Sequence, residues 1–233
     1  MVDRDARLSP ASPVSPARLE RAAPVRWLEG WTLTLVAAAA VAAIALAIVL
    51  AGGADAEAIG LAIRVTARTS FALFTAAFTA SALHALWPGR LTRWLRRNRR
   101  YLGVAFAASH AVHAAAITAL AVLQPAAFTA HMATTARVPG LVGYGLLAAM
   151  TITSFDRTAA AIGPRAWKLL HLVGSLYLWG SFFQAFLRRA PHAPAYWLPV
   201  AVAVAAIALR VVAWRRSRAA RPARLRVTPQ RST

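Results

Sequence analysis

The chain has 233 residues, of which 59% are hydrophobic and only 15% are charged. This composition is too apolar for a soluble globular domain and predicts an integral membrane protein. Lys and Arg number 27 against 7 Asp and Glu, but they gather at the ends of apolar segments, as topology signals do, which argues against a nucleic-acid partner. The absence of cysteine excludes disulfides, thiolate metal sites and cysteine nucleophiles.

Six apolar segments of the chain have the composition of membrane-spanning helices. Residues 1–30 come first, and their three Ser-Pro pairs and mixed charges predict a disordered cytoplasmic tail rather than a secretory signal. The sequence then predicts an all-α integral membrane protein, a bundle of about six transmembrane helices over residues 31–214. The spans are expected at about residues 31–50, 67–87, 101–123, 141–154, 167–187 and 195–214.

Polar, Pro-containing and Gly-containing segments separate these spans. The segments 124–140 and 156–165 are expected to be loops, the second of them punctuated by Gly163-Pro164. His131 and His192 fall in loops on the side opposite the two termini. Residues 215–233 form a basic tail that is expected to lie along anionic lipid head groups.

Most of the Lys and Arg residues fall on one side of the six-span arrangement. That side holds both terminal tails and the loops after the second and fourth spans. Because Lys and Arg mark the cytoplasmic side, we expect both termini in the cytoplasm and a multi-pass protein of a bacterial-type inner (plasma) membrane. The densest group follows the second span and comprises Arg90, Arg93, Arg96, Arg97, Arg99 and Arg100.

Histidines are the informative polar side chains of the spans, because an ionisable group at membrane depth is costly. His84 and His171 lie near span ends on the side expected to be cytoplasmic, whereas His110 and His113 lie deep in the third span on one face. Histidines without carboxylate partners favour haem iron over a proton relay, since a neutral imidazole binds iron through one ring nitrogen. The alternatives are an interfacial position for the first two, and a hydrogen bond to a backbone carbonyl across a helix pair for the others.

Two motifs, in the right order, resemble those of the ferric-reductase-like transmembrane domain family. The segment RRYLGVAF (99–106), followed by His113, resembles the family's arginine pair, Leu-Gly and downstream helix histidine. The segment TSF (153–155) and then WKLLHLV (167–173) resembles its Thr-Ser loop and the Trp-Lys-x-Leu-His start of its fifth helix. The resemblance covers about residues 70–190 and is nearest to the haem-binding membrane subunit of the periplasmic methionine sulfoxide reductase system.

The resemblance implies b-type haem between the third and fifth spans and electron transfer across the membrane, as the membrane haem subunit of an oxidoreductase system. It implies His113 as the outer and His171 as the inner ligand of haem iron. The sequence departs from the family where a second histidine is expected, thirteen residues after His171, because that position is Gln184. The amide oxygen of glutamine is a weak donor to haem iron, so the outer pair of ligands is incomplete.

Three arrangements remain open at this point. His84 and His171 could ligate one inner haem together, because they lie at similar depth. His110 or His113 could be the sole strong ligand of a haem. The site could also have been lost, which would leave a non-catalytic membrane scaffold or assembly subunit.

The expected partners follow from the haem interpretation. The electron donor would be a cytoplasmic flavoprotein or a quinol, and the acceptor would lie on the periplasmic or other extracytoplasmic side. No Gly-x-Gly-x-x-Gly fingerprint of a dinucleotide-binding unit is present, so a flavin would have to be held peripherally.

Overall fold

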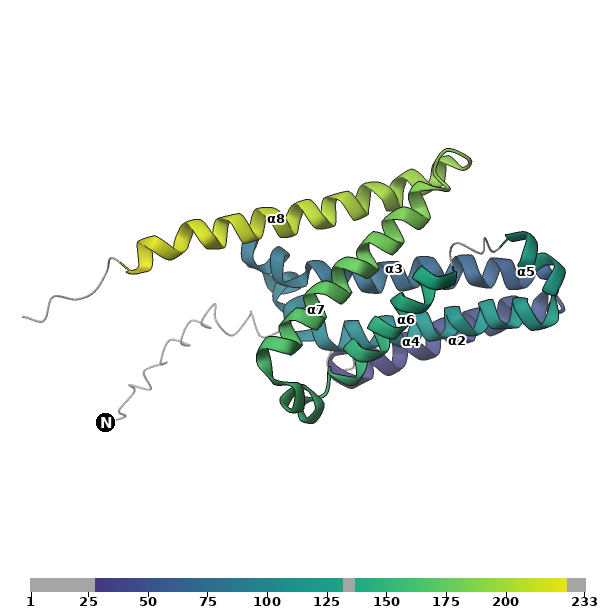
Figure 1. Cartoon of the computed structure of the whole chain (residues 1–233), viewed down its shortest axis with the longest axis horizontal. Coiled ribbons are helices and arrows are strands. Elements are labelled where there is room, and N and C mark those ends of the chain that lie inside the picture. Colours follow the sequence, from purple (N-terminus) through teal and green to yellow (C-terminus); the bar gives the residue numbers. More distant parts are fainter. Residues whose placement is uncertain (1–27, 132–136, 226–233) are drawn as a thin grey trace, which may run out of the picture.

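The computed structural model describes residues 28–131 and 137–225. These residues form helices and contain no strand, which confirms the all-α fold class (Figure 1). The tail predicted over residues 1–30 lies almost wholly outside the described residues. The elements are α2 (Gly30–Ala51), α3 (Ala56–Leu86), α4 (Arg90–Leu123), α5 (Pro125–His131), α6 (Arg137–Ile152), α7 (Asp156–Leu187), the 3-10 helix η3 (Pro194–Tyr196) and α8 (Trp197–Leu225).

Five of these helices are long and apolar enough to cross a membrane. They are α2, α3, α4, α7 and the segment Pro194–Ala219, which is mostly α8. The fourth predicted span, residues 141–154, corresponds to α6, whose apolar part, Val138–Ile152, is shorter. A helix of 16 residues is about 24 Å long at 1.5 Å per residue, somewhat less than the hydrocarbon core of a typical bilayer. The structure is therefore that of a multi-pass membrane protein.

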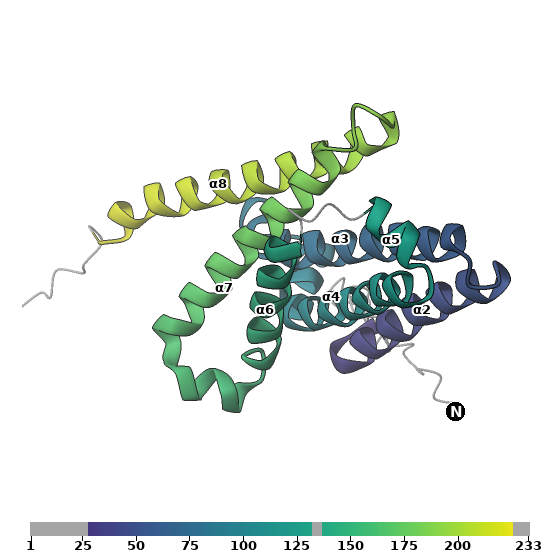
Figure 2. The same cartoon turned by 45° about the vertical axis from the view of Figure 1, so that its right-hand side comes forward.

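Successive long helices run in alternating directions. In Figure 1, α2, α3 and α4 lie side by side, α6 packs against α7, and α8 runs along the upper side of the bundle, where it packs against α3 and α7. Figure 2 shows the same arrangement from another side, with α8 along one edge of the bundle. One end of the bundle holds the α3–α4 turn, the α6–α7 turn, the start of α2 and the last turn of α8. We call it the basic end because it also holds the arginines from Arg90 to Arg100.

Several helices are longer than the hydropathy pattern predicts. The arginine-rich segment before residue 101 is the first part of α4 rather than a loop, and α8 continues beyond residue 214 to Leu225. Residues 125–131 of a predicted loop form α5. Hydropathy marks only the apolar part of a helix, whereas arginine is itself a good helix former, so the polar extensions were not predicted.

The predicted loop 156–165 is also mostly helical. It forms the start of α7 and is interrupted at Gly163, whose φ of 76° lies in the left-handed region that glycine adopts without strain. Pro164 follows directly, and its missing N–H cannot continue the helical hydrogen bonds. The Gly-Pro pair therefore produces a kink in a long helix and not a separate loop.

The interior between α3, α4 and α7 is filled by aromatic rings. Phe74 of α3 lies 5.3 Å from Phe106 of α4 and 5.5 Å from Phe182 of α7, measured between ring centroids. Aromatic pairs at such distances add to the stabilisation that burial alone provides. We call this set the phenylalanine core, and its members are Phe71, Phe74, Phe78, Phe106, Phe182 and Phe186.

A row of hydroxyl groups joins α3 to α4. The Oγ atoms of Ser70 and Ser109 are 2.8 Å apart, and Thr69 Oγ1 lies 3.4 Å from Ser109 Oγ. Ser70 and Ser109 are both fully buried. Small hydroxyl side chains let two helices approach closely and bond to each other inside a membrane. This contact holds α4, which carries His110 and His113, against α3.

Candidate functional site

His113 of α4 is held by two oxygen atoms of α3. Its Nδ1 lies 3.0 Å from Thr66 Oγ1 and 3.2 Å from the carbonyl oxygen of Ile63. The Thr66 hydroxyl donates its own hydrogen to the carbonyl of Ala62 at 2.7 Å, so it accepts from His113. Both contacts therefore require a hydrogen on Nδ1, which in the neutral ring leaves Nε2 without one. An imidazole with Nδ1–H bonded to a carbonyl and a bare Nε2 has the tautomer that metal-ligating histidines use.

His110 stacks against His113 and against Tyr144 of α6. The His110 ring centroid is 5.1 Å from that of His113 and 5.0 Å from that of Tyr144. His110 Nδ1 and the Tyr144 hydroxyl are buried and have no hydrogen-bond partner among the described residues. A buried polar atom without a partner costs about 1–3 kcal/mol, so this pair marks a place where a polar group is missing.

An apolar groove of about 560 Å³ runs between α4 and α6 beside this pair. Ala107, Ala111 and Ala114 of α4 form one wall, and Tyr144 and Leu147 of α6 form the other. The volume lies in the range of small-molecule and cofactor sites. The small α4 side chains therefore leave room for a flat or elongated apolar group next to Tyr144.

His171 lies in α7, two turns beyond the kink at Gly163, and contacts both parts of the second family-like motif. Its Nε2 is 3.2 Å from Thr153 Oγ1, and its ring stacks on Trp167 at 4.3 Å. The indole N–H of Trp167 donates to the carbonyl oxygen of Thr153 at 2.8 Å. Since the Thr153 hydroxyl donates to Ala149, the Nε2–H of His171 donates to Thr153. Nε2 is thus occupied in this structure.

His84 lies at the α3–α4 turn, where it bonds a different threonine. Its Nδ1 is 3.3 Å from Thr92 Oγ1, which also accepts from the backbone N–H of Gly89. His84 and His171 therefore each serve a separate helix–helix turn. Within residues 28–131 and 137–225, no group of three or more His, Asp or Glu side chains is placed to hold a metal ion.

Gln184 stands where the family pattern has the second histidine of its fifth helix, and its side chain is exposed. At about 100° per residue, thirteen positions turn it about 140° away from His171, whereas eleven positions bring Phe182 back to within about 20°. Phe182 accordingly faces α4, with its ring 5.7 Å from that of His110. A phenylalanine therefore lies where a second imidazole opposite α4 would be needed.

These side chains fit haem as a site with one strong ligand and not as a bis-histidine pair. The bare Nε2 of His113 fits an axial ligand, and Tyr144, which stacks on His110, lines a groove of suitable size. Gln184 points away from α4, and the phenylalanine core fills the region between α4 and α7.

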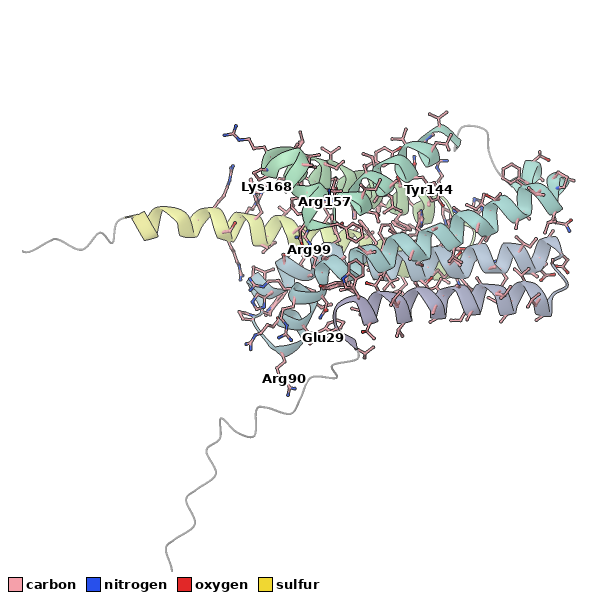
Figure 3. All side chains as sticks on the ribbon, turned by 90° about the horizontal axis from the view of Figure 1, so that it is seen from below. Glu29, Arg90, Arg99, Tyr144, Arg157 and Lys168 are labelled. Carbon is pink, nitrogen blue, oxygen red and sulfur yellow. The ribbon has the colours of Figure 1, made fainter. Side chains whose placement is uncertain are left out.

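Sequence reasoning missed two residues that the structure brings forward. Tyr144 is the one tyrosine in a short apolar helix. A polar hydroxyl in such a segment is the feature of the sequence that could have marked it as a candidate site residue. Arg210 lies one turn before Trp214 and inside the predicted span 195–214, where an arginine is unusual. Figure 3 shows Arg90, Arg99, Arg157 and Lys168 toward the basic end, with Tyr144 further along the bundle.

Comparison of the chain with protein-family models, with curated proteins and with solved structures found no match.

Proposed function

We propose that the chain is a multi-pass membrane protein that binds b-type haem with His113 as its one strong axial ligand and that serves electron transfer across the membrane. The observation that carries the proposal is the hydrogen bonding of His113, whose Nδ1–H is fixed by Ile63 and Thr66 and whose Nε2 is bare. Haem, when bound, supplies the one-electron chemistry of its iron. The two motifs that resemble the ferric-reductase-like family support the same function.

The surrounding residues have separate tasks in this proposal. Thr66 and the Ile63 carbonyl fix the tautomer and the orientation of the His113 ring. Ser70 and Ser109 keep α4 at a constant distance from α3, and the phenylalanine core keeps water away from this part of the bundle. The donor would be a cytoplasmic flavoprotein or a quinol, and the acceptor an extracytoplasmic protein.

A haem titration of the purified chain tests the proposal. After reconstitution with excess haemin and removal of unbound pigment, we expect about one haem per chain and a b-type α-band in the reduced-minus-oxidised spectrum. A folded chain that keeps no haem under these conditions would overturn the proposal.

A haemless membrane scaffold or assembly subunit is the second candidate. Two observations favour it: Gln184 faces outward, and phenylalanine rings occupy the space between α4 and α7. His113 would then be a structural residue that ties α4 to α3 across the membrane. The same titration separates the two candidates, because the scaffold would remain colourless while retaining its helical circular dichroism.

Topology gives a further prediction of the proposal. Helix α2 begins and α8 ends at the basic end, so reporters fused after Gly89, in the α3–α4 turn, and after Thr233 should both report the cytoplasm. A reporter fused after Gly53, in the α2–α3 turn, should report the opposite side. An extracytoplasmic signal after Gly89 would contradict the orientation.

A further inference from the structure

Two arginines from different helices contact the same part of α3. Arg210 of α8 donates from Nη1 to the carbonyl oxygen of Phe78 at 2.8 Å, and its guanidinium carbon lies 4.1 Å from the centroid of the Phe78 ring. Arg99 of α4 donates from Nη1 to Ser81 Oγ at 3.4 Å. Phe78 and Ser81 are three positions apart, about 4.5 Å along the helix axis. We call Arg99 and Arg210 the arginine pair.

The arginine pair has no acidic partner among the described residues. The two ion pairs formed by those residues join Arg97 to Glu29 and Arg100 to Asp156. Arg210 lies one turn inside Trp214, and an arginine at such a depth is costly unless its charge is compensated. A carbonyl and an aromatic face stabilise a guanidinium but do not neutralise it. The pair therefore places two like charges on the same part of α3 without a carboxylate of the described residues to balance them.

We propose that the arginine pair binds the phosphate of an anionic membrane lipid. Guanidinium groups match phosphate oxygens in geometry, and basic pockets between helices at the cytoplasmic side of a membrane hold lipid head groups. The Arg99 side chain is exposed, so its remaining N–H groups can be reached from outside.

The surroundings of the pair indicate a lipid rather than a free anion. Trp214 is 54% exposed and Trp87 is 60% exposed, and tryptophans of this kind lie at the level of the lipid head groups. Val211 and Val212, next to Arg210, are each 42% exposed and offer an apolar surface to an acyl chain. This site does not depend on the haem proposal, because it involves other residues and another ligand.

Native mass spectrometry of the purified full chain tests the inference. The chain is stripped of lipid in detergent and titrated with phosphatidylglycerol, and with phosphatidylcholine for comparison. A basic residue that contacts an anionic lipid head group contributes about fivefold to its binding, so Arg99→Gln together with Arg210→Gln should weaken phosphatidylglycerol binding about 25-fold. Arg99→Lys with Arg210→Lys should bind more tightly than the double Gln variant and more weakly than the unaltered chain, because lysine keeps the charge but not the paired N–H groups of the guanidinium.

The matched control removes the same charge elsewhere on α4. Arg93 and Arg96 are exposed, and Arg93→Gln with Arg96→Gln should bind phosphatidylglycerol within about twofold of the unaltered chain. An equal loss in this control would show a diffuse charge effect and overturn the inference. Unchanged phosphatidylglycerol binding in the Arg99→Gln, Arg210→Gln variant would also overturn the inference. The same holds if the unaltered chain binds phosphatidylcholine as tightly as phosphatidylglycerol.

A competition experiment and a single variant complete the test. Excess inorganic phosphate should not displace phosphatidylglycerol, and displacement at millimolar phosphate would assign the site to a free anion instead. If the double Gln variant does not fold, as judged by thermal unfolding in the same detergent, Arg99→Gln alone carries the test, because that side chain is exposed. The single variant should then bind phosphatidylglycerol about fivefold more weakly.

Discussion

Replacing His113 by alanine is expected to remove most of the bound haem. Loss of a partner that merely orients a metal ligand costs roughly 10- to 100-fold in affinity, and loss of the ligand itself should cost more. Nothing opposite α4 can take over, because Gln184 faces outward and Phe182 carries no donor atom. The haem-to-chain ratio of His113→Ala, measured as the pyridine haemochrome after reconstitution, should therefore fall at least tenfold.

Two variants serve as controls for this experiment. His192 is exposed in the turn after α7, so His192→Ala should keep the haem content of the unaltered chain. Gln184→His would supply the histidine that the family pattern expects, but on a face turned away from α4, so it should neither raise the haem content nor change the spectrum. A gain of haem in Gln184→His would show that α7 faces α4 differently from the structure described above.

Replacing Gly174 by leucine is expected to separate α6 from α7. Even a Cβ at this position would overlap the thioether of Met150, whose Cγ would lie at 3.2 Å. Overpacking of a tight contact commonly costs 1–3 kcal/mol, and movement of the flexible Met150 side chain relieves part of the overlap, so a four-carbon side chain should lower the free energy of unfolding by about 2 kcal/mol. Equilibrium unfolding of the purified chain in mixed micelles measures this difference.

Gly180, on the same helix, is the matched control. A Cβ at Gly180 would have no heavy atom within 4 Å, so Gly180→Leu should be neutral or slightly stabilising, as expected when leucine replaces glycine in a helix. Shortening the opposing side chain should restore part of the loss, so Gly174→Leu with Met150→Ala should be more stable than Gly174→Leu alone. If Gly174→Leu and Gly180→Leu were equally stable, that result would contradict the close contact between α6 and α7.

Hydropathy was sufficient to predict the helical architecture, because each apolar run must satisfy its own backbone hydrogen bonds in a bilayer. It could not place helix ends that lie outside the apolar runs. Residues 90–100 are polar yet helical, and α3 begins at Ala56, where Asp55 Oδ1 accepts from the backbone N–H of Ala58 at 2.7 Å. Such caps and arginine-rich turns depend on local hydrogen bonds rather than on burial.

The candidate site was predictable to a different extent for each residue. Thr153, Trp167 and His171 belong to the second family-like motif and are in contact in the structure, but their contact was not predicted. The outward direction of Gln184 follows from helical periodicity and could have been deduced from its spacing to His171. The contact between Tyr144 and His110 could not be deduced, because it depends on how α6 packs against α4, and a single sequence does not fix how two helices pair.

The proposed function depends on how many strong ligands haem iron would have in this chain, because the resemblance to the ferric-reductase-like family accounts for only one of the outer pair. A haem with one histidine keeps a sixth position that is open or weakly held, whereas a haem with two histidines has none. Tyr144 and His110 line the approach to α4 but offer no second imidazole from an opposing helix.

Carbon monoxide binding to the dithionite-reduced chain tests this single-ligand account most directly. If His113 is the one strong ligand, carbon monoxide should bind to the ferrous haem and shift its Soret band at once. A reduced b-type spectrum that carbon monoxide leaves unchanged would show two strong ligands and contradict the account, and a purified, folded chain with no haem spectrum at all would contradict haem binding itself.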